Sequence, residues 1–340
     1  MSEPVLSMRD LRIWYGAERG AVRAVDGVSL DLLAGETVGL VGESGCGKST
    51  LGRGVLGLLP EGAGHAGEVS YKGRNILDLK DRELRDLRGP ELGMIFQEPM
   101  TRLNPLMKIS AHFEEVLKIH EPELGKKESR KRSIETLRGM GIPPTRYTQY
   151  PHEFSGGMRP RIMIALALVL RPAVVVADEP TTALDVLVEA QILRIIADLR
   201  RNFDTALLLI THNLGIVAEA CDRVAVMYAG RVVEQGSAYD ITTKPAHPYS
   251  RELLRSTISL STTKLHSIPG APPDLVHPPP ACRFHPRCPD AMTVCAELWP
   301  PTVAVGTARR SECWLHAKDE IPAGLQTPLE RKALGVAEEA

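Results

Sequence analysis

Apolar and polar residues alternate in short blocks up to about Gly236, an arrangement typical of an α/β domain. Three apolar runs of strand length, Thr37–Val41, Val174–Ala177 and Ala206–Ile210, have almost no polar face, which suits strands buried on both sides of a sheet. A charged, helix-like stretch at residues 107–137 separates the first run from the second. We therefore expect an α/β fold with an inserted helical lobe.

The pattern changes sharply near Tyr239. Residues 269–289 are rich in proline, which disfavours regular helix and sheet. The last segment, residues 318–340, is charged and poor in aromatics, so we expect it to be partly disordered. The predicted units are an α/β domain at 1–240 with its helical lobe at about 98–160, a small C-terminal extension at 241–318 and a flexible tail at 319–340.

The composition limits the class of protein. Hydrophobic residues make up 43% and charged residues 24%, as in ordinary globular proteins, and a net charge of −1 argues against a nucleic-acid binder. The first ten residues lack the pattern of a signal peptide, so we expect none. The longest apolar stretch, Ile162–Leu170, is about half the roughly 20 residues that span a bilayer. We therefore expect any membrane role to come through a partner.

Residues 42–49 match the phosphate-loop pattern G-x-x-x-x-G-K-[ST] between an apolar strand and a helix, a context that disfavours a chance glycine-rich turn. Its backbone N–H groups can point at phosphate oxygens, and the helix N-terminus adds partial positive charge. We expect Lys48 to reach the β- and γ-phosphates and Ser49 to ligate Mg²⁺. Alone, the loop indicates only some enzyme of nucleotide phosphates. The expected ATP-binding residues here are Gly42, Glu43, Ser44, Gly45, Cys46, Gly47, Lys48, Ser49 and Thr50.

Two carboxylates, Asp178 and Glu179, follow the second apolar run. Strand ends in a parallel sheet meet at the ligand-binding edge, so both are expected beside the phosphate loop. We expect Asp178 to hold Mg²⁺ through water and Glu179 to act as general base toward the attacking water. Two exposed loop carboxylates are the alternative, which the buried strand and the upstream phosphate loop disfavour.

The segment Phe-Ser-Gly-Gly-Met-Arg at residues 154–159 resembles the signature of ABC ATPases, usually Leu-Ser-Gly-Gly-Gln. The resemblance implies a second anion cradle at a helix start, which contacts the γ-phosphate bound to another subunit, so that one chain holds half of each site. Pro160 departs from the family pattern, which usually has glutamine there, although proline is tolerated in a first helical turn. The signature residues are Ser155, Gly156, Gly157 and Met158.

Other motifs of that family occur in order along the domain. Gln97 resembles the Q-loop residue that touches Mg²⁺ or the water, and His212 resembles the switch histidine that contacts the γ-phosphate or positions the general base. Asp185 resembles the D-loop aspartate. Tyr15 resembles the aromatic that stacks on adenine, although Trp14 is adjacent and either ring could belong to the core. The resemblance implies an ABC-type nucleotide-binding domain, a P-loop core sheet with an inserted helical signature subdomain, which hydrolyses ATP with Mg²⁺.

A finer resemblance is to the ATP-binding subunits of oligopeptide, dipeptide and nickel importers, on segments 96–105, 150–159, 247–249 and 281–289. It implies a second, often non-identical ABC ATPase subunit, two transmembrane permease subunits and a substrate-binding protein as partners, with no nucleic acid. The place implied is peripheral, at the cytoplasmic face of the inner membrane. Di- or oligopeptides are the favoured cargo. Nickel or another small solute, or a non-transport soluble ABC ATPase, are the alternatives.

Four of the six cysteines lie in the last sixty residues, with five, six and seventeen residues between them. Four thiolates can bind zinc or an iron–sulfur cluster, and this spacing fits neither the usual zinc pairs nor the ferredoxin run, while plain thiols are a third alternative. The importer resemblance favours a structural [4Fe-4S] cluster that folds the extension, with zinc as the alternative. A redox protein built on these cysteines leaves the ATPase motifs unexplained. The predicted ligands are Cys282, Cys288, Cys295 and Cys313.

Overall fold

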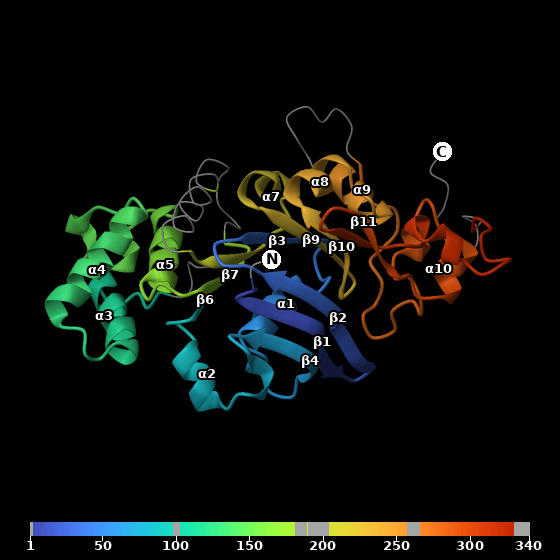
Figure 1. Cartoon of the computed structure of the whole chain (residues 1–340). Coiled ribbons are helices and arrows are strands. Elements are labelled where there is room, and N and C mark those ends of the chain that lie inside the picture. The colour runs from blue at the N-terminus through green and yellow to red at the C-terminus, as the bar shows by residue number, and fades with distance from the viewer. Residues whose placement is uncertain (1–2, 98–102, 181–188, 190–203, 257–265, 330–340) are drawn as a thin grey trace.

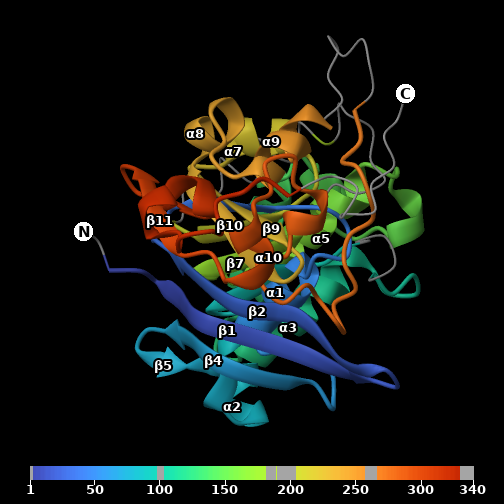
Figure 2. The same ribbon diagram turned by 90° about the vertical axis from the view of Figure 1, so that its right-hand side faces the viewer.

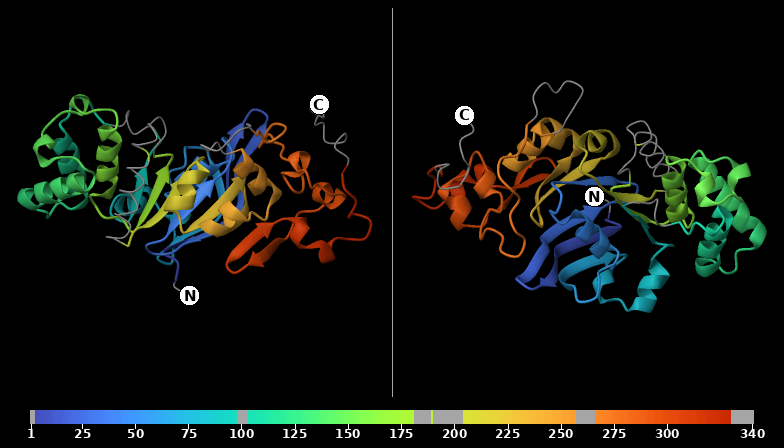
Figure 3. Two further views of the ribbon diagram at one scale, coloured as in Figure 1. Left: turned by 90° about the horizontal axis from the view of Figure 1, so that it is seen from above. Right: turned by 180° about the vertical axis from the view of Figure 1, so that it is seen from behind.

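The structure is a computed structural model of the chain and describes residues 3–97, 103–180, 189, 204–256 and 266–329. Within these ranges the strands form two sheets that pack on opposite sides of one helix, α1 (Lys48–Val55) (Figure 1). The helical lobe and the C-terminal extension lie at opposite ends of the larger sheet (Figure 1 and Figure 3).

The larger sheet forms the core of the α/β domain. Its neighbouring strands β3 (Thr37–Val41), β8 (Ala206–Ile210) and β7 (Val174–Asp178) are parallel and buried at every position, as their apolar runs predict. The prediction of an α/β fold is therefore confirmed. Among the described residues the strand order is β11 (Thr302–Gly306), β12 (Arg309–Glu312), β10 (Arg231–Ser237), β9 (Arg223–Tyr228), β3, β8, β7 and β6 (Leu92–Ile95).

The second sheet is antiparallel and covers the other face of α1. Leu6 and Met8, and beyond a β-bulge Leu11 and Ile13, are fully buried two residues apart, which is the period of a strand with one buried face. They join Leu51 and Val55 of α1 in one hydrophobic cluster. The strand order is β2 (Gly20–Leu32), β1 (Leu6–Ala17), β4 (Gly64–Tyr71) and β5 (Arg74–Asn75), followed in the chain by helix α2 (Asp81–Leu87).

The helical lobe lies where the charged stretch predicts it. Ile109, Phe113 and Leu117 recur every four residues on one helix, so they share one face and are buried together against the other helices. This lobe carries the signature segment at the start of its last helix, well away from the β3–α1 connection (Figure 1). Its helices are α3 (Ile109–His120), α4 (Lys126–Gly139) and α5 (Met158–Leu168).

The C-terminal extension continues the larger sheet. Its hairpin of β11 and β12 pairs with β10, where Glu234 lies opposite Ser311, and the rest packs beside it (Figure 2). The rings of Tyr228, Tyr249 and Phe284 meet with centroids 4.5 to 5.3 Å apart and form a buried core beneath the proline-rich segment. The helices of this part are α7 (Leu214–Ala220), α8 (Ala238–Thr243), α9 (Pro248–Arg255) and α10 (Thr293–Glu297).

Part of the expected flexible tail is folded onto this extension. Leu329 donates a backbone hydrogen bond to Ala291, Thr293 donates one to Thr327, and Ile321 is buried. The tail expected at 319–340 is therefore ordered as far as Leu329, because its backbone pairs with the segment around α10. Residues 330–340 lie outside the described ranges. In the described ranges, no helix combines the length and the apolar character needed to cross a membrane.

Candidate functional site

The phosphate loop connects β3 to α1, as its motif predicts. Gly47 has a φ of 106°, and a Cβ at this position would lie 1.9 Å from the carbonyl oxygen of Ala24, so only glycine fits. Lys48 is buried, and its Nζ donates to the carbonyl oxygens of Gly42 and Glu43 at 2.8 and 2.9 Å. The loop thus holds the Lys48 ammonium group against its own carbonyl oxygens, where the group is available to a phosphate bound by the loop.

Asp178 lies at the end of β7, fully buried, beside the start of α1. Its Oδ1 accepts a hydrogen bond from the Ser49 hydroxyl at 2.9 Å. Burial raises the pKa of Asp178, and this hydrogen bond opposes the increase. Hydroxyl and carboxylate oxygens are the ligands that Mg²⁺ prefers, so this pair fits a magnesium ion.

Glu179 brings the three predicted catalytic side chains together. Its φ of 45° turns the chain sharply after β7, a conformation that few non-glycine residues adopt. Gln97 Nε2 donates to one carboxylate oxygen at 3.3 Å, and His212 Nδ1 lies 3.3 Å from the other. The Glu179 side chain is 17% exposed and that of His212 is 63% exposed, so the group faces open space.

These residues line one pocket of about 500 Å³, a size ordinary for a small-molecule site. Tyr15 lines it and its hydroxyl lies 3.3 Å from Thr50 Oγ1, whereas Trp14 is not part of the lining. Sequence reasoning missed Val22, Ala24 and Leu275, because apolar walls need no particular spacing. The lining residues expected from the motifs are Tyr15, Ser44, Gly45, Gly47, Lys48, Ser49, Thr50, Gln97, Glu179 and His212.

The signature residues do not join this pocket. Ser155 and Gly156 are exposed just before α5, which starts at Met158 and places Pro160 in its first turn. The segment predicted to form a second anion cradle therefore faces solvent, apart from this pocket. The predicted D-loop residue, Asp185, lies outside the described residues.

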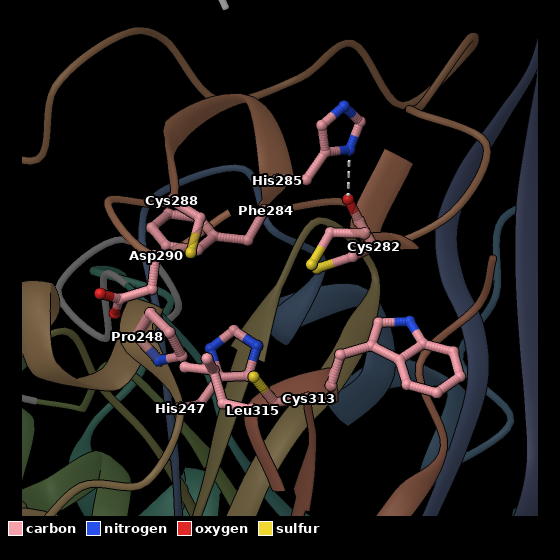
Figure 4. A pocket seen from close by; sticks show the side chains of 11 residues that line it. His247, Pro248, Cys282, Phe284, His285, Cys288, Asp290, Cys313 and Leu315 are labelled. Atoms are coloured by element: carbon pink, nitrogen blue, oxygen red, sulfur yellow. Dashed lines mark hydrogen bonds between the residues drawn. The ribbon is translucent and has the colours of Figure 1, made fainter. Parts of the chain in front are cut away.

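The four cysteines of the extension line a separate cavity next to α9 (Figure 4). Figure 4 shows the sulfur atoms of Cys282, Cys288 and Cys313 turned toward the same space, and Cys295 completes the lining. The cavity volume is about 10 Å³, which is room for about one water molecule. Burial raises the pKa of Cys282 and of Cys313 to about 12, so without a neighbouring cation both are neutral thiols.

The metal expectations for these cysteines are not supported. No group of three or more His, Cys, Asp or Glu side chains in the described part of the chain is placed to hold a metal ion. The enclosed space is small, so this arrangement holds neither a [4Fe-4S] cluster nor zinc unless the side chains move apart.

One lining residue has an unsatisfied polar atom. His247 is buried, and its Nδ1 accepts the backbone N–H of Tyr249 at 3.0 Å, while its Nε2 makes no hydrogen bond of good geometry, the backbone of Glu312 being its neighbour. Burial lowers the pKa of His247 to about 3, so the ring is neutral and carries its proton on Nε2. A buried N–H donor thus borders the cavity of the four thiols.

Both the α/β domain and the C-terminal extension match known protein families. Residues 25–182 match the family model described as ABC transporter, and residues 233–295 match that of the oligopeptide/dipeptide transporter C-terminal region. The dipeptide transport ATP-binding protein DppD of Bacillus subtilis (strain 168) is 45% identical over 92% of this chain and 95% of its own length. The oligopeptide transport ATP-binding protein OppD of Salmonella typhimurium (strain LT2) is 46% identical over 91% of this chain and 93% of its own.

Solved structures give the same fold for the α/β domain. The dimeric post-hydrolysis structure of the ATP-binding cassette MJ0796, bound to ADP and Pi, is 27% identical, with a TM-score of 0.61 over 68% of this chain and 98% of that one. The cbiO1 protein of Clostridium perfringens, part of the ABC transporter complex cbiONQ, is 28% identical, with a TM-score of 0.61 over 72% of this chain and 92% of that one.

Proposed function

Because the chain belongs to the oligopeptide and dipeptide transport ATP-binding proteins of the ABC transporter family, we propose that it hydrolyses ATP to drive peptide uptake through a permease. The observation that carries the proposal is the single pocket that gathers Lys48, Ser49, Glu179 and His212 from separate elements. The names of its relatives indicate di- or oligopeptides as the cargo.

In the proposed reaction, backbone N–H groups of the phosphate loop and Lys48 bind the phosphates, and Tyr15 stacks on the adenine. Glu179 accepts the proton of the attacking water, while His212 positions the carboxylate that it approaches within 3.3 Å. Gln97 contacts the other oxygen of the same carboxylate, so it reports to the helical lobe whether the site is occupied. Lys48 and His212 line the same pocket, so both can stabilise the charge that develops on the γ-phosphate.

Magnesium is the cofactor of this reaction. When bound, Mg²⁺ would supply positive charge that neutralises the phosphates. Ser49 and Asp178 are the residues proposed to hold it, supported by the 2.9 Å hydrogen bond that the Ser49 hydroxyl donates to the Asp178 carboxylate. Gln97 is proposed as a further ligand once nucleotide is present.

A second ABC ATPase subunit completes the site in this proposal. Ser155, Gly156, Gly157 and Met158 are proposed to contact the γ-phosphate bound by the partner. The exposure of Ser155 and Gly156 supports this, because an unpaired anion cradle at a helix start needs an anion from elsewhere. The dimeric state of MJ0796 gives the same support by similarity.

The remaining proposed partners are two transmembrane permease subunits and, through them, a substrate-binding protein. Peripheral association with the cytoplasmic face of the membrane follows from that assembly. Uptake by the complete transporter in vesicles is the test: labelled di- or oligopeptide should accumulate only with ATP inside and binding protein outside. Accumulation of nickel in place of peptide would overturn the cargo, and ATP hydrolysis stimulated by DNA but not by permease would overturn the transport role.

The four cysteines of the extension are proposed to bind a [4Fe-4S] cluster with a structural role. The supporting observation is the set of four cysteines that line one cavity together with the buried ring of His247. The side chains must move apart to admit it. Iron and acid-labile sulfide measured in anaerobically purified protein decide the matter, and their absence, or stoichiometric zinc, would reject the cluster.

A further inference from the structure

The turn between Cys282 and Cys288 has two faces. Its cysteines line the thiol cavity, while its arginines, Arg283 and Arg287, point away from that cavity and into the α/β domain. The side chain of Arg287 is 4% exposed, although a guanidinium is rarely buried without a specific partner. Its contacts therefore show what the buried charge is used for.

Arg287 forms an ion pair with Glu43 of the phosphate loop. Its two terminal nitrogens donate to the two carboxylate oxygens of Glu43 at 2.7 and 2.9 Å, which is the bidentate geometry of the strongest ion pairs. The remaining N–H groups meet the carbonyl oxygens of Ile268 and Pro269 and the Tyr228 hydroxyl. All five donors are used, so the guanidinium has one orientation.

The backbone of Glu43 is held in place as well as its side chain. Its own N–H donates to the Tyr249 hydroxyl at 2.8 Å, and its carbonyl oxygen accepts from Lys48 Nζ at 2.9 Å. One residue of the loop is thus held by the extension through both its side chain and its backbone. That same residue contacts the lysine expected to bind the phosphates.

We propose that Arg287 is a positioning residue of the ATPase site, which fixes the phosphate loop through Glu43. The C-terminal extension is then part of the nucleotide site, and not only a covering attached to the sheet. The entry of Leu275, from the same extension, into the wall of the nucleotide pocket agrees with this. The proposal rests on the proposed assignment of that pocket to ATP.

The chain contains a matched control. Arg283, in the same turn, pairs with Asp26 of β2, and the exposed fractions of these side chains, 4% and 18%, are close to the 4% and 23% of Arg287 and Glu43. Removing either pair should loosen the extension to a similar degree. Only the Arg287–Glu43 pair touches the phosphate loop, so only its loss should change how ATP is bound.

The experiment uses the full-length chain in the assembled transporter. Variants Glu43→Gln, Arg287→Met, their double combination and the control Asp26→Asn are compared for unfolding temperature, KM for ATP and kcat. We expect the KM for ATP to rise about fivefold or more in each single variant of the pair. The double variant should be no worse than either single one, since both remove one interaction. The control should lose thermal stability and keep the wild-type KM.

If Arg287→Met does not fold, Arg287→Lys replaces it, because lysine keeps the positive charge but cannot form the bidentate ion pair. The KM of Arg287→Lys for ATP should lie between those of wild type and Glu43→Gln. A KM unchanged in Glu43→Gln, or raised equally in Asp26→Asn, would reduce the pair to a structural attachment and overturn the inference. A wild-type transporter that binds no MgATP would instead overturn the assignment of the pocket.

Discussion

The phosphate loop and the Cys282–Cys288 turn lie against each other, yet they hold charge by different means. The loop uses backbone geometry: glycines such as Gly47 allow its curl, and local hydrogen bonds hold Lys48 within six residues of its acceptors. The turn uses a long side chain that acts over more than two hundred positions of sequence, because Arg287 pairs with Glu43. The first arrangement is readable as a motif, whereas the second is visible only when the chain is folded.

The strongest test of the loop side is the loss of the general base. Glu179→Gln should lower ATP hydrolysis about 100-fold or more, because the amide cannot accept the proton of the attacking water, while ATP binding is kept. Steady-state hydrolysis by the assembled transporter and binding of labelled ATP measure the two quantities. Hydrolysis within a few-fold of wild type would remove Glu179 from the catalytic role.

The strongest test of the extension side is its aromatic core. Phe284 is fully buried against Tyr228, Tyr249 and His247, so Phe284→Ala should lower the free energy of unfolding by about 3–5 kcal/mol. Chemical denaturation of the purified chain measures it, with Phe284→Leu as the smaller control change. A loss below about 1 kcal/mol would mean that the extension depends on a bound metal and not on this core.

A smaller effect should show that the extension contributes to the wall of the nucleotide pocket. Leu275→Ala removes apolar surface from the wall of the pocket that Tyr15 also lines. It should raise the KM for ATP about 10-fold or less, with kcat unchanged, since a contact with the base is the same in the ground and transition states. Val276→Ala, one residue along and absent from the lining, is the control. Equal changes in both variants would indicate a general disturbance of the segment.

The smallest expected effect concerns the signature. Pro160 lies in the first turn of α5, where the missing N–H has no intrahelical acceptor, so Pro160→Gln should change the ATPase rate about twofold or less. The rate in the assembled transporter measures it. A large gain would show that the proline limits hydrolysis through the partner's site.

Much of the fold and of the nucleotide site follows from sequence pattern. The apolar runs at 37–41 and 206–210 predict two strands to the residue, since burial on both faces requires unbroken apolar character. Lys48, Gln97, Glu179 and His212 were each predicted from a motif, and all four meet at one pocket. Their positions are predictable because the ends of parallel strands converge on one edge of a sheet.

The extension shows where prediction from sequence stops. Its cysteines suggest a metal-folded segment, whereas Tyr249 and Phe284 pack on Tyr228 of β9 in a core shared with the α/β domain, and backbone pairing reaches Leu329. Aromatics far apart in the sequence carry no spacing signal, so their cluster was not predicted. The tail boundary was misplaced for the same reason, because its hydrogen-bond partners lie in another segment.

The sequence by itself determined the phosphate loop, the carboxylates Asp178 and Glu179 and the order of the ATPase motifs, because those features depend on local backbone geometry and on strand ends. Only the tertiary structure decided that Leu275 lines the nucleotide pocket, that His247 lines a cavity with four thiols and that Arg287 forms an ion pair with Glu43. Such contacts depend on how separate segments pack, and a buried guanidinium finds its carboxylate through the fold and not through spacing along the chain.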